Sequence, residues 1–458
     1  MILETVILAA GKGTRMFSSK PKVLHELSGK SMLGYVLDAV HELDCDHIHV
    51  VYGHGGQQVK DKFSGLSINW VHQSDQKGTG HAVAQAMPGI DEYSIVLILY
   101  GDVPLIRPVT LNPLVQLAAQ NNLALLTINL EEPGSLGRII RNHQGHIIAI
   151  TEYKDATQSE RNIKEINTGV VAVKARFLRQ WLTQISDNNA QKEFYLTDIV
   201  ELAVNDSVPV VSIQAETELE IMGVNSKLEL GKLERMQQQQ LAFDLMRQGL
   251  SISDPARFDL RGRLDFGEDC HVDVNTVIEG DCEFGNNVRI GAHCIIKNSK
   301  IADHTRIEPF SLIEDSTVGA RCNVGPYARL RPGSELKEGS RIGNFVEIKN
   351  STIGKNSKAN HLSYVGDAQV GNDVNMGAGM ITCNYDGANK HKTIIGDNVH
   401  VGSDCQLVAP VKIDDGATIG AGTTVYKNAP KDELTVNKKE QYVLTGWQRP
   451  KKINSKNK

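Results

Sequence analysis

The chain has 458 residues, which suggests two or three domains at the usual ~150 residues each. Hydrophobic residues make up 40% and charged residues 22%, so the chain can bury a core, and wholesale disorder is excluded. The net charge of −5 argues against a nucleic-acid-binding protein, which would carry a broad basic face. No apolar run approaches the ~20 residues of a membrane span, and no basic, apolar leader opens the chain. Seven cysteines without a C-x-x-C pair agree with reduced thiols, and we expect a cytoplasmic protein without a membrane partner.

The first half of the chain alternates short β-branched runs with helical stretches. Strands are expected at Thr5–Ala9, His47–Val51, Ile95–Leu99 and Ala124–Leu130, and helices at Met32–Leu43, His81–Ala86 and Thr110–Gln120. This alternation predicts an α/β domain with a mostly parallel sheet.

A glycine-rich loop follows the first predicted strand, beginning Leu8-Ala9-Ala10-Gly11 and running to Met16. Such glycines expose backbone N–H groups that can hold an anion. Met16 stands where a dinucleotide fingerprint needs its third glycine, and the Gly-Lys-Ser/Thr of a P-loop is missing. The loop alone would be an ordinary tight turn about half the time. The two nearby cations Arg15 and Lys22 favour phosphate binding.

A carboxylate, Asp102, comes directly after the apolar strand that ends near Tyr100-Gly101. In open α/β sheets, ligands lie beyond the carboxyl ends of the strands. The alternative is that Asp102 is a turn residue or a helix cap.

Residues Ser226 to Gln248 predict a helix, with Leu233, Met236 and Leu241 spaced to form one apolar face. The stretch has fewer than the three or four heptads of a coiled coil, so we interpret it as a connecting helix. The expected domains are residues 1–227, a linker helix at 228–248, and residues 249–458.

The second half has a different pattern. Residues 1–250 hold 30 leucines and residues 251–458 only nine, so helices are expected to be rare there. After Cys270 an aliphatic residue recurs every six positions, with single-residue slips. The series reads Val272, Ile278, Phe284, Ile290, Ile296; Ile301, Ile307, Ile313; Val318, Val324, Leu330, Leu336, Ile342, Ile348; Ile353, Ala359, Val365; Val370, Met376; and Ile395, Val401, Leu407, Ile413, Ile419, Val425. A period of six predicts a solenoid of short strands and turns whose aliphatic residues point inward.

Two features of the solenoid indicate chemistry. The repeat breaks at Cys383–Ile394, which predicts an inserted loop, and inserted loops often carry function. Arg331 and Lys349 are 18 residues apart, one coil of three hexapeptides, so both cations lie on one edge and can hold a phosphate. Without His361 nearby, solvated surface charges would be the better interpretation.

The motif Leu-Ala-Ala-Gly-x-Gly-Thr-x-Met followed by Pro-Lys, with Gly101-Asp102, resembles the sugar-nucleotidyltransferase family. The resemblance implies a Rossmann-like nucleotidyltransferase domain that binds UTP and holds Mg²⁺ between Asp102 and Asn225. It implies uridine contacts from Gln73, Gly78 and Thr79, and sugar contacts from Gly137, Glu152 and Asn167. A sugar 1-phosphate would attack the α-phosphorus of UTP and release pyrophosphate, with Arg15, Lys22 and the metal stabilising charge.

Both halves together resemble one family, the bifunctional bacterial N-acetylglucosamine-1-phosphate uridyltransferases that are also glucosamine-1-phosphate N-acetyltransferases. The resemblance covers essentially the whole chain, including the segments 254–262, 343–347 and 382–387. It implies a left-handed parallel β-helix and a homotrimer. It also implies that Arg331, Lys349, Tyr364 and Asn375 bind the sugar phosphate, and that His361 is the general base for attack of the amine on acetyl-CoA.

The same resemblance implies an acetyl-CoA side of the site. Its residues would be Ala378, Asn384, Tyr385, Ser403, Ala421 and Lys438. Lys438 stands where the family commonly has arginine, and it loses the bidentate fork. Cys383 and Cys405 have no evident base beside them, which favours direct transfer over an acyl-cysteine.

The expected activity is therefore acetylation of glucosamine 1-phosphate by acetyl-CoA, followed by uridyl transfer from UTP to N-acetylglucosamine 1-phosphate. The product, UDP-N-acetylglucosamine, supplies peptidoglycan and lipid A synthesis. One alternative is a single-activity hexose-phosphate nucleotidyltransferase whose β-helix only serves oligomerisation. A second is a non-enzymatic translation exchange-factor subunit, whose glycine loop would usually be degraded, whereas Gly11, Lys22 and Asp102 are intact.

Overall fold

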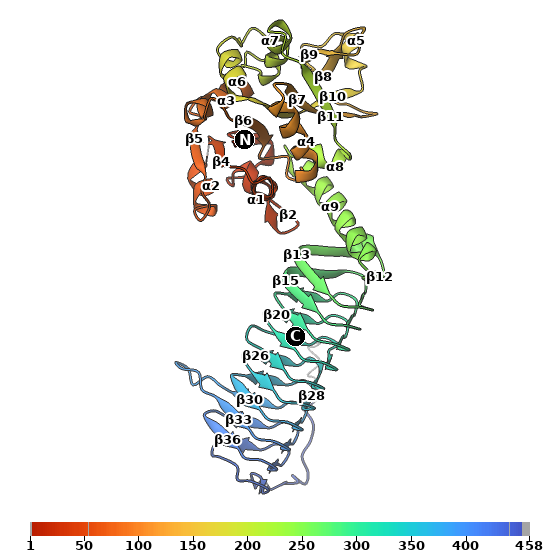
Figure 1. Cartoon of the computed structure of the whole chain (residues 1–458). Coiled ribbons are helices and arrows are strands. Elements are labelled where there is room, and N and C mark those ends of the chain that lie inside the picture. The colour runs from red at the N-terminus through yellow and green to blue at the C-terminus, as the bar shows by residue number, and fades with distance from the viewer. Residues whose placement is uncertain (1, 54, 439, 451–458) are drawn as a thin grey trace, which may run out of the picture. The chain divides into compact units, whose positions relative to one another are not determined.

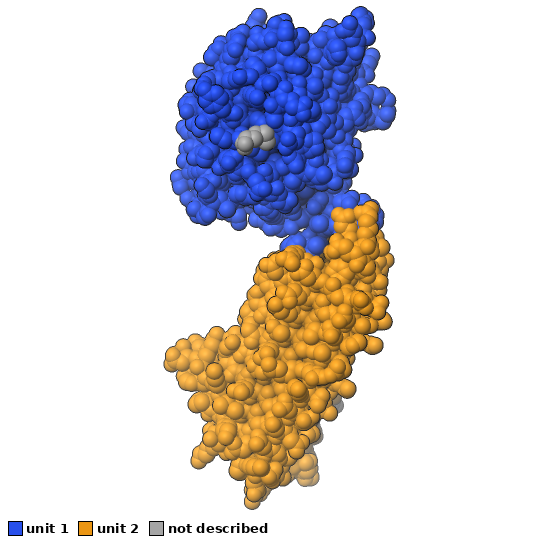
Figure 2. Space-filling model, in the orientation of Figure 1, with its two compact units in different colours: residues 1–243, 260–262 blue, residues 244–259, 263–458 orange. Residues whose placement is uncertain are grey.

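The computed structural model describes residues 2–53, 55–438 and 440–450, and the chain forms two compact units (Figure 2). Unit 1 consists of Met1–Phe243 with Leu260–Gly262, and unit 2 of Asp244–Asp259 with Arg263–Lys458. Within the described part of the chain, no helix is both long and apolar enough to cross a bilayer.

Unit 1 is built on a nine-stranded sheet (Figure 1). The main strand order is β11 (Val210–Gln214), β7 (Leu123–Asn129), β10 (Glu165–Lys174), β6 (Ile95–Tyr100), β1 (Leu3–Ala9), β4 (His47–Tyr52) and β5 (Asn69–His72). The strands β6, β1, β4 and β5 are parallel, as are β7 and β11, whereas β10 runs antiparallel to both of its neighbours. A hairpin of β8 (Arg138–Arg141) and β9 (Ile147–Thr151) joins the sheet through β10, and β2 (Glu26–Leu27) pairs only with β3 (Lys30–Ser31). The predicted mostly parallel α/β sheet is confirmed.

Helices cover both faces of this sheet, because each face of its apolar strands must be buried. One core cluster packs α1 (Met32–His41), α2 (Gly56–Lys62) and α4 (Pro108–Ala119) against it. The opposite cluster involves α3 (Thr79–Ala86), α6 (Ala175–Leu182) and α7 (Ile199–Asn205). Shorter elements complete the unit. They are α5 (Gln158–Arg161), α8 (Glu218–Ile221) and the 3₁₀ turns η1 (Thr14–Met16), η2 (Lys22–Leu24), η3 (Met87–Gly89) and η4 (Leu196–Asp198).

The connecting helix α9 spans Lys227–Arg247, close to the expected bounds. The expected apolar face is wrong at one position, since Met236 is 39% exposed while the polar Gln238 is 1% exposed. Gln238 is buried because its side-chain amide forms hydrogen bonds with the backbone of Leu260. Its Oε1 accepts from Leu260 N at 2.7 Å, and its Nε2 donates to Leu260 O at 2.9 Å. A hydropathy pattern alone does not reveal such a pairing.

Unit 2 is a stack of parallel coils, beginning with β12 and the 3₁₀ turn η5 (Pro255–Arg257) (Figure 1). One of its sheets has eleven strands: β12 (Ser251–Ile252), β14 (His271–Val272), β16 (Arg289–Ile290), β19 (Arg306–Ile307), β22 (Asn323–Val324), β25 (Arg341–Asn344), β28 (Lys358–His361), β31 (Asn375–Met376), β34 (His400–Val401), β37 (Thr418–Ile419) and β39 (Leu434–Thr435).

A seventeen-stranded sheet supplies the other sides of the coils. Its strands are β13 (Phe258–Phe266), β15 (Thr276–Phe284), β17 (Ile295–Lys297), β18 (Lys300–Ile301), β20 (Leu312–Glu314), β21 (Thr317–Val318), β23 (Arg329–Leu330), β24 (Glu335–Leu336), β26 (Glu347–Lys349), β27 (Thr352–Ile353), β29 (Tyr364–Gly366), β30 (Ala368–Val370), β32 (Ile381–Cys383), β33 (Thr393–Ile395), β35 (Gln406–Val408), β36 (Val411–Ile413) and β38 (Thr424–Val425). The predicted parallel β-helix of hexapeptides is confirmed.

The six-residue period has the expected structural meaning. Every aliphatic residue of the predicted series is at most 4% exposed, so the series forms the interior of the β-helix. Small polar residues stand at many corners and hydrogen-bond to the next coil, as Ser334 Oγ does to Ile348 O at 3.0 Å and Ser340 Oγ to Gly354 O at 3.0 Å. Cysteine takes this role at several corners, and all seven cysteines are free.

Candidate active sites

A cavity of about 260 Å³ opens at the carboxyl ends of β1 and β6 in unit 1. Because these strands are parallel neighbours, the glycine loop after β1 and Asp102 after β6 meet at one edge of the sheet. Ten of the residues with an expected role line the cavity: Leu8, Ala9, Ala10, Gly11, Lys22, Gln73, Gly78, Thr79, Tyr100 and Asp102. Gln76 and Glu193 also line it, and the sequence pattern did not single them out.

The end of the cavity where uridine contacts are expected is held by contacts around Gly78 and Thr79. Gly78 has φ +111°, and a Cβ there would lie 2.6 Å from Phe194 O, so only glycine fits. Leu196 N donates to Thr79 Oγ1 at 3.1 Å, which fixes the segment that brings Glu193 into the wall. Gln73 is 3% exposed and lies 2.9 Å from His81 Nδ1.

The two expected metal ligands converge on one cation. Lys22 Nζ contacts Asp102 Oδ2, and it lies 3.2 Å from Asn225 Oδ1. Val224 N donates to Asp102 O at 2.9 Å, which brings Asn225 to the sheet edge from a position over 120 residues away. A carboxylate and an amide oxygen facing one positive charge form a donor set suited to Mg²⁺, which usually takes few protein ligands and keeps waters or phosphates.

The three expected sugar contacts also come together, next to Tyr100. Asn167 N donates to Gly137 O at 2.9 Å, and a Cβ on Gly137 would lie 3.5 Å from both carboxylate oxygens of Glu152. Burial raises the pKa of Glu152, although Thr197 Oγ1 donates to its carboxylate at 3.3 Å. Burial, with the charges of Glu152 and Asp102, raises the pKa of Tyr100, so its phenol stays a donor.

Two other expected residues lie at the margin. Arg15 is exposed on η1 and is not among the residues that line the cavity. Gly101 N donates to Leu8 O at 2.9 Å and joins the two strand ends.

Asp198, which lies near the expected sugar contact Glu152, gives a stability prediction. Burial, with the charges of Glu201, Glu152 and Asp155, raises its pKa to about 6 from the ordinary 3.8. The folded state then binds this proton more tightly than the unfolded chain, so stability falls as pH rises from about 4 to about 6 and stays lower above. Asp198→Asn should remove this loss. Because solvent screens a half-buried group, we expect the substitution to raise the free energy of unfolding at pH 8 by roughly 1 kcal/mol, which raises the unfolding midpoint of unit 1 by about 2–4 °C. At pH 4 we expect no gain. Calorimetry at both pH values measures it, and an equal gain at pH 4 would contradict the titration.

In unit 2, the expected phosphate ligands form a cluster on adjacent coils. The backbone register places Arg331 beside Lys349, since Leu330 pairs with Ile348. Arg331 Nη1 lies 2.8 Å from Glu347 Oε1, and Lys349 Nζ lies 3.5 Å from Asp367 Oδ2.

Asp367 connects this cluster to the inserted loop. Its Oδ2 accepts from Asn384 Nδ2 at 2.5 Å, and the same Asn384 nitrogen lies 3.4 Å from Tyr364 Oη. Although burial alone raises the pKa of Asp367, hydrogen bonds from Asn350 and Asn384 bring it below its ordinary value. Asn384 and Tyr364, expected on the acetyl-CoA and sugar-phosphate sides, are therefore direct neighbours.

The inserted loop adds Lys390, a cation that the sequence analysis did not assign. Tyr385 and Lys390 form an antiparallel bridge, and Asp386 closes the loop by accepting from Ala388 N, Asn389 N and His391 Nε2. The hydrogen bond and positive charge of Lys349 lower the pKa of Lys390. Asn384, on the same loop, contacts Asp367, which also lies 3.5 Å from Lys349 Nζ, so the loop folds toward the Lys349 coil. A six-residue repeat with a break shows that a loop exists, but not toward which coil it folds.

Because the resemblance implies that this cluster binds glucosamine 1-phosphate, we predict that Lys390→Gln raises the KM for that substrate roughly tenfold or more, the effect of one lost charged hydrogen bond. Lys412→Gln is the matched control, because Lys412 is an exposed lysine that pairs with Asp414 at 2.7 Å. Initial rates of acetyl transfer at varied sugar phosphate measure the effect. Equal KM values in the two variants would contradict it.

His361 ends β28 at a corner, and its Nδ1 lies 2.8 Å from Asn344 Oδ1 on the preceding coil. Asn344 pairs with His361 in the register, 17 residues earlier, so the repeat itself could have identified it. The strand pairing on the following coils ends two residues before the positions of Ala378, Ser403 and Ala421. If the register continues by two residues, these residues align with His361 on successive coils. These expected residues therefore form one column along the corner.

The remaining expected residues lie close to this column or beyond it. Asn375 Nδ2 lies 3.4 Å from His400 Nδ1, Tyr385 is exposed on the inserted loop, and Lys438 is exposed after β39. Burial raises the pKa of Cys383, and the buried Cys405 directs its thiol to Gly420 O at 3.2 Å. These surroundings suit structural thiols.

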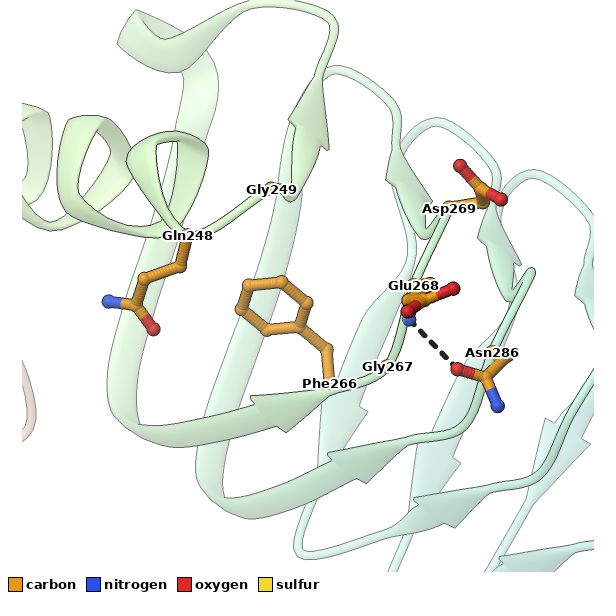
Figure 3. A pocket seen from close by; sticks show the side chains of 7 residues that line it. All are labelled: Gln248, Gly249, Phe266, Gly267, Glu268, Asp269 and Asn286. Carbon is orange, nitrogen blue, oxygen red and sulfur yellow. Dashed lines mark hydrogen bonds between the residues drawn. The ribbon is translucent and has the colours of Figure 1, made fainter.

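A larger hollow, of about 440 Å³, lies at the first coils of unit 2 (Figure 3). The ring of Phe266 faces it, and Glu268 N donates to Asn286 Oδ1 at 2.9 Å on its rim. None of the residues with an expected role is part of its lining, so we assign no chemistry to it.

Comparison with known proteins agrees with both halves. Residues 5–164 match the MobA-like NTP transferase domain, residues 261–338 the GMPPB C-terminal domain, and residues 392–427 the bacterial transferase hexapeptide of six repeats. The chain is 50% identical over 453 residues to the "Bifunctional protein GlmU" of Acinetobacter baylyi, covering 99% of this chain and 100% of that protein. It is 52% identical to the GlmU of Marinobacter nauticus, over 98% of this chain and 99% of that protein, and 51% identical to that of an Azoarcus species, over 98% and 100%.

The chain belongs to the GlmU family.

Membership decides between the interpretations that the sequence left open. The chain is a bifunctional enzyme of UDP-N-acetylglucosamine synthesis, with a nucleotidyltransferase unit and a hexapeptide acetyltransferase unit that use UTP and acetyl-CoA. The exchange-factor alternative and the single-activity alternative are both excluded for a GlmU protein.

Proposed function

We propose that uridyl transfer takes place in the cavity of unit 1 and acetyl transfer at the His361 corner of unit 2. The observation that supports this division is that each expected residue set gathers within one unit. Lys22, Asp102 and Asn225 converge in the first, and Arg331, Lys349 and Tyr364 gather in the second. We also propose functional domains at residues 1–227 and 249–458, joined by the helix at 228–248.

In the uridyl-transfer site, Gln73, Gly78 and Thr79 bind the base, and Gly137, Glu152 and Asn167 bind the sugar. The phosphate oxygen of N-acetylglucosamine 1-phosphate forms a bond to the α-phosphorus of UTP, and the bond to the pyrophosphate oxygen breaks. Asp102 and Asn225 would hold Mg²⁺, which supplies charge stabilisation at the phosphates when bound. Lys22 exchanges its contact with Asp102 for one with phosphate, and the main-chain N–H groups of the glycine loop orient the triphosphate.

In the acetyl-transfer site, Arg331, Lys349 and Lys390 bind the phosphate of glucosamine 1-phosphate, with Tyr364 and Asn375 beside the sugar. His361 accepts a proton from the amine while nitrogen attacks the thioester carbonyl, and coenzyme A leaves as the thiol. Asn344 holds His361 Nδ1, so Nε2 is free to act. The Ala378 N–H would stabilise the oxyanion, and Asn384, Tyr385, Ser403, Ala421 and Lys438 would bind coenzyme A.

We propose that the protein is a homotrimer, supported by a column of stacked aromatic side chains on the corner that carries His361. Ring centroids are 4.7 Å apart from His293 to Phe310, 4.8 Å from Phe310 to Tyr327, and 5.3 Å from Tyr327 to Phe345. Phe310, Tyr327 and Phe345 are 47–56% exposed, and each has a positive φ that bulky residues rarely adopt. An exposed apolar column of this kind marks a protein interface.

A charged substitution in this column should dissociate the trimer. We predict that Phe310→Asp gives monomers in sedimentation equilibrium and loses acetyl transfer before uridyl transfer, because the column belongs to unit 2 and runs next to His361. Glu283→Gln, on an exposed side chain that pairs with Lys300, is the control. A monomer with full acetyl transfer would contradict the proposal.

The use of UTP and acetyl-CoA also leads us to propose a cytoplasmic enzyme.

Product analysis tests the whole proposal. The purified full chain is incubated with glucosamine 1-phosphate, acetyl-CoA, UTP and Mg²⁺, and we expect free thiol, pyrophosphate and UDP-N-acetylglucosamine. Absence of thiol would overturn the acetyl-transfer assignment. Absence of pyrophosphate when N-acetylglucosamine 1-phosphate is supplied would overturn the uridyl-transfer assignment.

A further inference from the structure

Unit 1 contains a buried guanidinium whose surroundings are unusual. Arg138, the first residue of β8, is 2% exposed. Across the described residues, its hydrogen-bond acceptors are all backbone carbonyls and none is a carboxylate. Burying a cation without an anionic partner costs folding free energy. The groups that the Arg138 guanidinium holds in place must therefore account for its burial.

The carbonyls belong to two separate segments. Arg138 Nη1 donates to Leu136 O and Nη2 to Gly134 O at 2.8 Å, both in the loop between β7 and β8. Nε and Nη2 both donate to Arg161 O at 3.4 Å, at the end of α5. One planar group with several fixed donors therefore ties the loop to the helix, which a lysine cannot do.

A third contact reaches the other wall of the proposed sugar site. The guanidinium carbon of Arg138 lies 5.5 Å from the ring centroid of Tyr153, and that of Arg161 lies 4.7 Å from it. Tyr153 directly follows Glu152, and Gly137 directly precedes Arg138. Gly137 faces Glu152, since a Cβ on Gly137 would lie 3.5 Å from both carboxylate oxygens. Tyr153 lies in the turn that Asp155 N closes on Glu152 O at 3.0 Å, so the contact between Arg138 and Tyr153 connects the residue after Gly137 to the turn that begins at Glu152.

We propose that Arg138 is a positioning residue for the sugar phosphate in uridyl transfer. It holds the 134–137 loop through Gly134 O and Leu136 O and contacts the Tyr153 ring, and so sets the distance between Gly137 and Glu152 across the sugar. This inference rests on the proposed sugar-binding role of Gly137, Glu152 and Asn167. It concerns the sugar side alone, because the uridine end is held by a different set of contacts around Gly78 and Thr79.

The test compares Arg138→Met with Arg141→Met in the full-length protein. Arg141 lies on the same strand, but it is paired with the carboxylate of Glu165 through two hydrogen bonds of 2.7 and 2.8 Å and contacts neither the 134–137 loop nor Tyr153 in the hydrogen bonds and ring contacts of the described residues. We expect Arg138→Met to raise the KM for N-acetylglucosamine 1-phosphate about 10- to 100-fold, the range for a small misplacement of binding groups. The KM for UTP should stay within about twofold, and Arg141→Met should change neither value.

A chemical rescue separates positioning from general damage. Arg138→Ala leaves a space of guanidinium shape, so added methylguanidinium should restore part of the sugar-phosphate KM, whereas methylammonium should not. Equal increases in both KM values without rescue, or an unchanged sugar-phosphate KM, would overturn the inference.

Asn167→Ala separates a failure of the positioning role of Arg138 from a failure of the proposed sugar site. If Asn167→Ala raises the sugar-phosphate KM and Arg138→Met does not, only the positioning role fails. If neither variant changes it, the proposed sugar site itself is wrong. Thermal unfolding and acetyl-transfer rates of each variant show whether the protein is folded.

Discussion

Replacing Asp102 with alanine should lower uridyl transfer by at least about 10²-fold while leaving acetyl transfer unchanged. Asp102 is one of two oxygen donors that converge on the position of Lys22 Nζ, and removal of one electrostatic contact to a reacting phosphate costs about 10²–10³ in rate. Part of the residual activity should return at high Mg²⁺ concentration, because the remaining donor binds the metal more weakly. Pyrophosphate release and thiol release measure the two reactions separately.

Asp61→Ala is the control for this variant, since Asp61 is an exposed carboxylate on α2 that accepts from Gln57 at 2.7 Å. Asn225→Ala should reproduce the phenotype more weakly, because a neutral amide oxygen is lost in place of a charged one. If Asp102→Ala keeps normal uridyl transfer, Asp102 only anchors Lys22 and the metal assignment is wrong. If it silences both reactions while circular dichroism shows a folded protein, the two-site proposal is wrong.

Replacing His361 with alanine should lower acetyl transfer by roughly 10²–10⁴-fold, the usual range for loss of a general base. Uridyl transfer should be unaffected when N-acetylglucosamine 1-phosphate is supplied, because the residues proposed for the two reactions belong to different units and should contribute independently. Asn344→Ala should produce a smaller loss, since it removes the group that holds His361 Nδ1 without removing the base.

His271→Ala serves as the matched control, because His271 lies on the same eleven-stranded sheet several coils earlier. Thiol release from acetyl-CoA with glucosamine 1-phosphate gives the rates. Acetyl transfer at the normal rate in His361→Ala would show that another group removes the proton. A loss of equal size in His271→Ala would show that the β-helix, and not the base, is being perturbed.

Several features of the site follow from adjacent residues alone. The glycine loop and Asp102 each follow a strand whose apolar run is continuous, and parallel packing places both strand ends at one edge. The column of Asn344, His361, Ala378, Ser403 and Ala421 follows from counting coils. In these cases the residues in contact follow the ends of neighbouring strands or lie one repeat apart. The local pattern and the repeat period are therefore enough to predict them from the sequence.

The amino-acid sequence by itself determined the α/β sheet, the inward face of every hexapeptide coil and the residue types of both proposed sites, because these depend on hydrophobic periodicity and short motifs. Only the tertiary structure decided that the inserted loop folds onto Asp367 beside Lys349, that Glu193 enters the unit 1 cavity, and that Gln238 is buried where Met236 was expected. It also decided that Arg138 is buried against backbone carbonyls. A loop's direction, or the burial of a polar side chain, depends on hydrogen-bond partners supplied by segments far away in the chain. No local pattern encodes those partners, since they exist only once the distant segments have packed.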